Sequence, residues 1–216
     1  MAQASLFAAC DGTESSIQKL QEGVVLMHRA FDSAKIFAAI QAVIAVAPLR
    51  HMETPGGKKM SVAMTNCGTV GWTSSRAGYA YSHIDPETKN PWPKMPSLLF
   101  ATAAQLADLA GYAGFAPDAC LINHYTPGTQ MGLHQDRDEK DFSQPIVSLS
   151  LGLPAKFIIG GLNRRDPARS IQLDDGDAIV FGGAARLLFH GVRPLKSGHH
   201  SVLGDSRINL TFRVTA

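Results

Sequence analysis

Two stretches of the chain carry apolar residues at the three-to-four spacing of an amphipathic helix. From Asp32, a suitable N-cap, this spacing continues until Pro48 ends it. A second stripe runs from Ser97 to Ala110, where Gly111 stops it. We therefore predict two helices, each packing one face on a core.

From residue 118 the pattern changes to short apolar strands separated by turn residues. The predicted strands are Ala119–Tyr125, Ile146–Leu151, Lys156–Gly160, Ile171–Leu173, Ala178–Phe181, Leu187–His190 and Arg207–Val214. The run Asp174-Asp-Gly-Asp177 predicts a hairpin turn between two of them. Strands that follow two helices predict an α+β fold that is mainly β, a double-stranded β-helix (jelly roll) backed by N-terminal helices.

The remaining segments are less regular. The first twenty residues are weakly patterned and predict an irregular lead-in. Residues 49–95 are polar, aromatic and rich in Gly, Pro and Ser. A loop-rich segment of this length is often functional, although it could equally cover the core. The length of 216 residues suits one domain, 1–216.

Composition narrows the class of protein. A net charge of +2 does not by itself argue for a nucleic-acid partner. The three cysteines, Cys10, Cys67 and Cys120, fit no zinc spacing or disulfide framework, which favours a reducing compartment. No signal-peptide pattern or membrane-spanning apolar run is present. We expect a cytoplasmic, monomeric enzyme without a membrane partner.

Three residues predict a metal site. His134 and Asp136 are two positions apart, so in an extended segment their side chains point the same way. With His190 they would form the two-histidine, one-carboxylate facial triad that binds non-haem Fe(II) and leaves positions open for a cosubstrate and O2. The H-x-D spacing alone is a weak signal, and zinc could use the same ligands.

The last predicted strand alternates polar and apolar side chains. Arg207, Asn209, Thr211 and Arg213 share one face. Such a row is costly to bury without a partner, and arginine grips carboxylates with two parallel hydrogen bonds. An edge strand with a solvated polar face would explain the row alone. A dicarboxylate cosubstrate beside iron explains the row and the triad together.

Several segments then identify a family. They are Met60-Ser-Val-Ala-Met-Thr-Asn-Cys-Gly68, Gly71-Trp-Thr73, Asp118-Ala-Cys-Leu-Ile-Asn123, His134-Gln-Asp136-x-Asp138, Ser148-Leu-Ser-Leu-Gly-Leu-Pro154 and Asn209-Leu-Thr-Phe-Arg213. With these, residues 24–214 resemble the AlkB family of Fe(II)/2-oxoglutarate-dependent DNA dealkylases. The match is specific, whereas the H-x-D motif and the arginine strand alone would indicate only the wider oxygenase superfamily.

The resemblance implies roles for the metal and cosubstrate residues. His134, Asp136 and His190 would bind iron. Arg207 would bind the C1 end of 2-oxoglutarate near the metal, and Arg213 would pair with its distal carboxylate. The further cosubstrate residues implied are Asn123, Tyr125, Asn209 and Thr211.

The resemblance also implies a substrate site. Trp72 and His134 would sandwich a damaged base. The other implied substrate residues are Thr54, Met64, Tyr79, Tyr81, Asp138 and Arg164. Residues 49–95 would be a nucleotide-recognition insertion, and 118–214 the catalytic jelly roll. Two positions depart from the family pattern: Phe181 stands where Trp is expected, and His124 stands where Arg is expected.

The implied reaction is oxidative removal of N-alkyl groups of the 1-methyladenine and 3-methylcytosine type from DNA, with RNA left open. It uses Fe(II), 2-oxoglutarate and O2, releases formaldehyde, succinate and CO2, and repairs DNA by direct reversal. These bases are cationic, so the Trp72 face and the Asp138 carboxylate would attract them. The base must be flipped out or single-stranded.

Other interpretations remain open. Trp72 could be a core anchor, and the run from Asp136 to Asp141 could be a solvated charged loop. The same chemistry could act on a protein or small molecule, although the aromatic and basic 49–95 segment argues against it. A non-catalytic nucleic-acid-binding jelly roll, or a zinc hydrolase, would leave the Arg207–Arg213 row unexplained.

Overall fold

A computed structural model describes residues 15–216, and both predicted helices are confirmed. They are α1 (Ser33–Val46) and α2 (Ser97–Leu109), and a short 3-10 helix, η1 (Gly183–Ala185), follows later. The Asp32 carboxylate accepts a hydrogen bond from the Lys35 backbone N–H at 3.1 Å, so it caps α1 as expected. No helix in residues 15–216 is long and apolar enough to cross a membrane.

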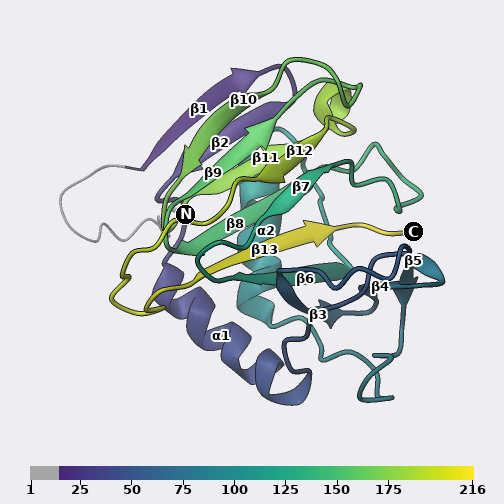
Figure 1. Cartoon of the computed structure of the whole chain (residues 1–216). Coiled ribbons are helices and arrows are strands. Elements are labelled where there is room, and N and C mark those ends of the chain that lie inside the picture. The colour runs from purple at the N-terminus through teal and green to yellow at the C-terminus, as the bar shows by residue number, and fades with distance from the viewer. Residues whose placement is uncertain (1–14) are drawn as a thin grey trace.

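Thirteen strands in the described residues form two sheets and a hairpin. The strands are β1 (Ser16–Gln21), β2 (Val24–His28), β3 (Ala63–Gly68), β4 (Gly71–Ser75), β5 (Gly78–Ser82), β6 (Ala119–Tyr125), β7 (Met131–His134), β8 (Ile146–Gly152), β9 (Ala155–Ile159), β10 (Arg169–Leu173), β11 (Ala178–Phe181), β12 (His190–Val192) and β13 (Arg207–Arg213). The larger sheet has the order β1-β2-β11-β8-β13-β6-β3, and the smaller has β10-β9-β12-β7. β4 and β5 pair only with each other. All these pairings are antiparallel, and the fold is the predicted jelly roll (Figure 1).

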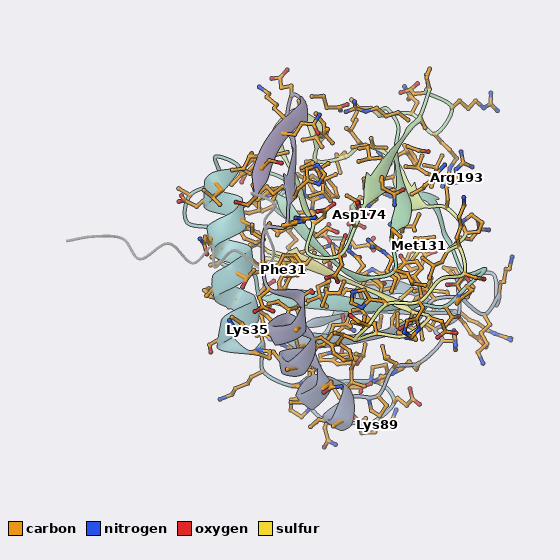
Figure 2. The ribbon with its side chains drawn as sticks, turned by 90° about the vertical axis from the view of Figure 1, so that its left-hand side faces the viewer. Phe31, Lys35, Lys89, Met131, Asp174 and Arg193 are labelled. Atoms are coloured by element: carbon orange, nitrogen blue, oxygen red, sulfur yellow. The ribbon has the colours of Figure 1, made fainter. Side chains whose placement is uncertain are left out.

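Strand alternation divides the core into two layers. On β13, Ile208, Leu210 and Phe212 face the cluster that contains the buried sides of α1 and α2. The helices lie together on one side of the molecule, and the segments that carry Met131 and Arg193 lie on the other (Figure 2). The polar row of β13 therefore faces the space between the two sheets, as its spacing predicted.

The N-terminal part is more regular than predicted. The expectation of an irregular lead-in is wrong for β1, which pairs with β2 at the edge of the larger sheet, while residues 1–14 lie outside the described residues. Most of β1 is exposed, so its sequence carries little apolar alternation, and its pairing with β2 defines it as a strand. Strand β3, inside the 49–95 segment, pairs with β6 in the larger sheet, so this segment is only partly loop.

Two details of the strand region differ from prediction. The turn at residues 174–177 joins β10 and β11, but these strands belong to different sheets, so it is a crossover and no hairpin. The Asp177 carboxylate holds this turn by accepting from the backbone N–H groups of Asp174 and Arg29. The strand predicted over Leu187–His190 begins only at His190, because η1 and a turn occupy the residues before it.

Candidate metal centre and its two cavities

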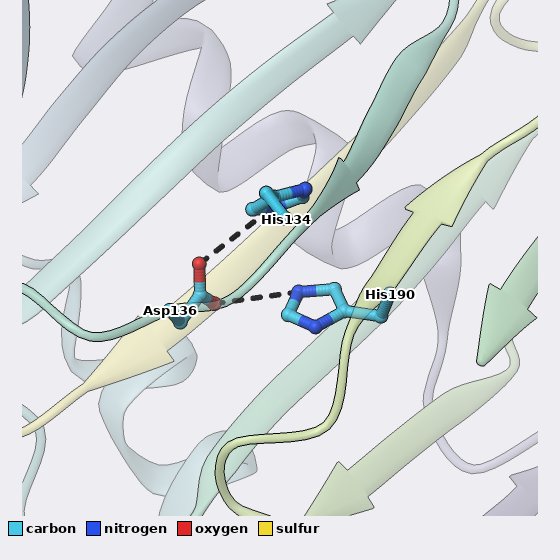
Figure 3. Close-up of side chains that lie close together, drawn as sticks. All are labelled: His134, Asp136 and His190. Atoms are coloured by element: carbon cyan, nitrogen blue, oxygen red, sulfur yellow. Dashed lines mark ion pairs between the residues drawn. The ribbon is translucent and has the colours of Figure 1, made fainter. Parts of the chain in front are cut away.

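The three predicted metal ligands lie together. His134 ends β7, His190 begins β12, and antiparallel pairing sets these two residues directly opposite each other, with ring centroids 4.5 Å apart. Asp136 follows β7, with one carboxylate oxygen 3.6 Å from His134 Nε2 and the other 3.7 Å from His190 Nε2 (Figure 3). One ligand atom from each residue lies within 4.8 Å of the others, so one ion can reach all three.

Backbone carbonyls orient both imidazoles. His134 Nδ1 lies 2.8 Å from the Gly132 carbonyl oxygen, and His190 Nδ1 lies 3.0 Å from that of Leu188. A carbonyl oxygen only accepts, so each Nδ1 carries the proton and donates. In the neutral form of each ring, Nε2 then keeps the lone pair with which it can bind a metal ion at the shared centre.

The electrostatics favour the ligating protonation states. Burial, together with the neighbouring His190, lowers the pKa of His134 to about 4, so the ring is neutral near pH 7. Burial alone would raise the pKa of Asp136, but the adjacent Arg213 guanidinium holds it well below its usual range. Two imidazoles and one carboxylate are the donor set of a facial-triad iron site.

A small cavity of about 60 Å³ opens beside the triad, between the two sheets. All six residues predicted to hold the cosubstrate line it. They are Asn123, Tyr125, Arg207, Asn209, Thr211 and Arg213. Its apolar wall includes Phe157 and Phe181, and the Phe181 ring meets the His190 ring edge-on at 5.0 Å. Phe181 thus retains an apolar wall at one position that departs from the family pattern.

The two arginines occupy the reverse of their expected places. Arg213, predicted at the distal end of the cosubstrate, donates from Nη2 to Asp136 Oδ2 at 2.7 Å and so lies beside the metal ligands. Arg207, predicted near the metal, instead donates to Ser150 Oγ at 2.8 Å and to the Leu153 carbonyl at 3.4 Å. The predicted order of the two arginines relative to the metal ligands is therefore wrong: it came from the family resemblance, and strand alternation fixes only the face on which they lie.

Two buried polar side chains in the small cavity each have one atom without a hydrogen-bond partner among residues 15–216, which bears on whether an anionic cosubstrate fits. Arg207 is 1% exposed and makes no ion pair among residues 15–216. Its Nε and the Oδ1 of Asn123 are buried without a hydrogen-bond partner in the described part of the chain. Burial lowers the pKa of Arg207, as expected for a cation without a counter-ion. A carboxylate beside Arg207 would supply the missing charge and an acceptor for Nε.

A second, larger cavity of about 640 Å³ adjoins the triad. Six of the seven predicted substrate residues line it: Thr54, Met64, Trp72, Tyr79, Asp138 and Arg164. The Trp72 indole N–H donates to Asp138 at 2.8 Å, and the Trp72 and Tyr79 rings stack with centroids 5.4 Å apart. Arg164 donates to the Leu133 carbonyl at 2.8 Å and lies over the Phe189 ring.

The seventh predicted substrate residue, Tyr81, does not line the larger cavity. It lies opposite Trp72 in the β4–β5 hairpin, and its hydroxyl donates to Glu139 Oε1 at 2.5 Å. Burial raises the pKa of Tyr81, and the Glu139 carboxylate adds to this rise, so the hydroxyl keeps its proton. Tyr81 therefore contacts the residues behind the metal centre.

Sequence reasoning missed two charged residues of this centre. Glu139 belongs to the run from Asp136 to Asp141 that could have been a solvated charged loop, but it is 5% exposed and pairs with Arg186 and Arg213. Arg186, only 2% exposed, was not singled out. Nothing in the local sequence distinguishes a buried charge from a solvated one. His124, the other departure from the family pattern, is half-buried, and burial lowers its pKa.

Comparison with known proteins gives consistent matches. The model of the 2OG-Fe(II) oxygenase superfamily matches residues 23–213. The chain is 52% identical over 198 residues to the alpha-ketoglutarate-dependent dioxygenase AlkB of Escherichia coli (strain K12), covering 91% of this chain and 92% of that protein.

Two further matches are more distant. The chain is 35% identical over 121 residues to the nucleic acid dioxygenase ALKBH1 of Mus musculus, covering 56% of this chain and 28% of that protein. The solved structure of OsALKBH1 superposes with a TM-score of 0.81 at 28% identity, covering 92% of this chain and 99% of that one.

Proposed function

This chain belongs to the 2OG-Fe(II) oxygenase superfamily, and we propose that it removes N-alkyl groups oxidatively from bases in DNA, with RNA as a second candidate. The proposed lesions are of the 1-methyladenine and 3-methylcytosine type. The enzyme is an Fe(II)- and 2-oxoglutarate-dependent dioxygenase, and its base substrate is the part that we propose.

The observation that carries the proposal is that two cavities meet at one set of metal ligands. His134, Asp136 and Arg213 line both the small cavity and the large one. The small cavity holds Arg207, which makes no ion pair in residues 15–216 and so suits 2-oxoglutarate, and apolar side chains such as Phe157 and Phe181 line the same cavity. The large cavity lies within the range typical of small-ligand sites and could admit a single base.

The large cavity also has the chemistry to select a cationic base. Trp72 is half-buried and offers an aromatic face, which attracts a cation by stacking and cation–π contact. Asp138, hydrogen-bonded to the indole N–H, places a negative charge at the same wall. Arg164 at this cavity could contact a phosphate of the strand. A methylated base that cannot pair is cheaper to extrude into such a cavity.

When bound, Fe(II) with 2-oxoglutarate and O2 supplies the oxidising power needed to break a C–H bond of the N-methyl group. The chain's residues orient the partners. Arg207 and Arg213 would hold the two carboxylates of 2-oxoglutarate, and Trp72 would hold the base. Hydroxylation of the methyl carbon gives an N–CH2OH group, which releases formaldehyde and leaves the nitrogen unalkylated. Succinate and CO2 complete the balance.

The proposed setting is the cytoplasm, with the enzyme as a monomer. Cys67 and Cys120 are both buried and free, as expected for a reducing compartment. Sedimentation of the purified protein would test the monomer directly.

The substrate assignment is tested with a single-stranded oligonucleotide that carries one 1-methyladenine. Incubation with the iron-loaded enzyme, 2-oxoglutarate and O2 should lower its mass by one CH2, while an unmethylated strand of the same sequence should stay unchanged. If no methylated DNA or RNA strand loses mass while the enzyme still converts 2-oxoglutarate to succinate, the proposed base substrate is wrong.

A further inference from the structure

Four buried charged side chains form a closed ring behind the metal centre. Arg213 donates to Asp136 Oδ2 from Nη2 at 2.7 Å and from Nε at 3.2 Å, and the same Nε forms an ion pair with Glu139 Oε1 at 3.2 Å. The other Glu139 oxygen accepts from Arg186 Nη2 at 2.9 Å. Arg186 Nη1 then donates to the backbone carbonyl of Asp136 at 2.7 Å, which closes the ring.

The ring is buried, which strengthens its hydrogen bonds. The side chains of Asp136, Glu139, Arg186 and Arg213 are each at most 9% exposed, so their hydrogen bonds have little competition from water. The third donor of Arg186, Nε, is taken by the Gln144 carbonyl at 3.0 Å. One guanidinium thus ties three parts of the metal-ligand loop together.

We propose that Arg186 and Glu139 are positioning residues for the metal centre. Arg186 holds the backbone of the metal ligand Asp136, and Glu139 holds Arg213 at a fixed place between two carboxylates. The proposal relies on the metal and cosubstrate assignment above but not on the nucleic-acid substrate.

The role of Glu139 follows from competition for one guanidinium. Arg213 already donates to Asp136 Oδ2, an oxygen that faces His190. The Nε of Arg213 is shared between Asp136 Oδ2 and Glu139 Oε1, each at 3.2 Å, so without the Glu139 charge Nε would bind Asp136 alone and compete more strongly with a metal ion for its carboxylate. Arg213 would also be less available to the C1 carboxylate of the cosubstrate. Glu139 therefore keeps Asp136 free to ligate.

Tyr81 links this ring to the β4–β5 hairpin. Its hydroxyl donates to Glu139, while Trp72 on the paired strand donates to the adjacent Asp138. The hairpin that bears the aromatic wall of the large cavity is thereby fastened to the loop that follows the metal ligands. Tyr81 joins Glu139 and Arg186 as a third positioning residue.

The test measures ligand binding by calorimetry: Mn(II) to the metal-free protein, then 2-oxoglutarate to the Mn(II) form. Arg186→Lys keeps the charge but cannot reach three acceptors, and Glu139→Gln keeps the shape but loses the charge. Each should weaken metal or cosubstrate binding by about 10–100-fold, the usual effect of changing a partner of a metal ligand. The fold-loss of affinity in the double variant should be smaller than the product of the two single fold-losses, because both residues act through the same ring.

Arg169→Lys is the matched control, because Arg169 also bonds a backbone carbonyl and a side-chain oxygen but lies on the exposed strand β10. It should bind both ligands as the wild type does. Unchanged binding in Glu139→Gln, or losses that simply multiply in the double variant, would overturn the proposal. If Arg186→Lys fails to fold, unchanged binding in Glu139→Gln still overturns the proposal.

Tyr81→Phe separates positioning from substrate contact. We expect weaker 2-oxoglutarate binding, by less than in Glu139→Gln, with unchanged affinity for a methylated oligonucleotide. The opposite result, weaker oligonucleotide binding with unchanged 2-oxoglutarate binding, would make Tyr81 a substrate contact and remove it from this proposal.

Discussion

Arg207 is a buried cation whose Nε has no partner in residues 15–216, while Arg213 on the same strand is held between two carboxylates. Burial alone would lower the pKa of Arg213, but Asp136, Tyr81 and Glu139 raise it. The two residues are identical in type and share one strand face, yet their surroundings give them different tasks.

Replacing Arg207 with Met should weaken 2-oxoglutarate binding by about 2 kcal/mol or more, roughly 30-fold, because a buried carboxylate would lose its charge partner. The affinity for Mn(II) alone should not change, since the hydrogen bonds of Arg207 go to Ser150 and Leu153 and none goes to a metal ligand. Calorimetry of both ligands checks this. An equal loss of both affinities would place Arg207 at the metal.

At the residue scale, the sequence predicted which side chains lie together around the metal site, but it did not predict their hydrogen bonds and ion pairs. His134, Asp136 and His190 were predicted because the metal requires those types at a compatible spacing. The order of Arg207 and Arg213, the buried Glu139–Arg186 pair and the place of Tyr81 depend on tertiary contacts between segments tens of residues apart.

At the element scale, the pairing of β7 with β12 builds the metal site, and the β4–β5 hairpin builds the wall of the larger cavity. Helices α1 and α2 and the apolar strands β6, β8, β11 and β13 were predictable because their periodicity is strong. Six strands were missed: β1, β2, β3, β4, β5 and β7. Four of them, β1, β4, β5 and β7, are short and partly exposed, and their pairing partners define them. Strands β2 and β3 are largely buried but short, and they too are defined by their partners in the larger sheet.

The hairpin's aromatic wall gives a prediction of its own. Trp72→Ala should weaken binding of a methylated oligonucleotide by about 1–3 kcal/mol, the range for one base stacked on an aromatic ring. Mn(II) and 2-oxoglutarate affinities should stay at the wild-type level, because Trp72 does not line the small cavity. Fluorescence anisotropy with a labelled strand measures the loss. Unchanged oligonucleotide affinity would return Trp72 to the role of a core anchor.

At the scale of the whole molecule, two sheets enclose the small cavity, and five residues that line both cavities connect it to the larger one: Leu121, Met131, His134, Asp136 and Arg213. The fold class was predictable from the sequence, since two helices followed by many short strands have few packed arrangements. The two cavities that meet at the metal site were not predictable from the sequence, because the shape of a cavity depends on how all the surrounding elements pack.

Mn(II) and 2-oxoglutarate would bind side by side in the small cavity, so we expect them to stabilise the fold cooperatively. At 100 times its dissociation constant a ligand adds about 2.7 kcal/mol, which corresponds to a rise in Tm of roughly 5–10 °C for a domain of this size. We expect Mn(II) and 2-oxoglutarate together to raise Tm by more than the sum of their separate effects in a thermal melt. Purely additive shifts would mean that 2-oxoglutarate binds away from the metal.

The most direct test of the account is product stoichiometry on one methylated strand under limiting enzyme. The wild type should release one formaldehyde for each succinate, and Asp136→Ala, which lacks a metal ligand, should release neither. Formaldehyde formed without succinate, or succinate formed at the same rate whether or not the strand is methylated and with no formaldehyde, would contradict the claim that both cavities serve one metal centre.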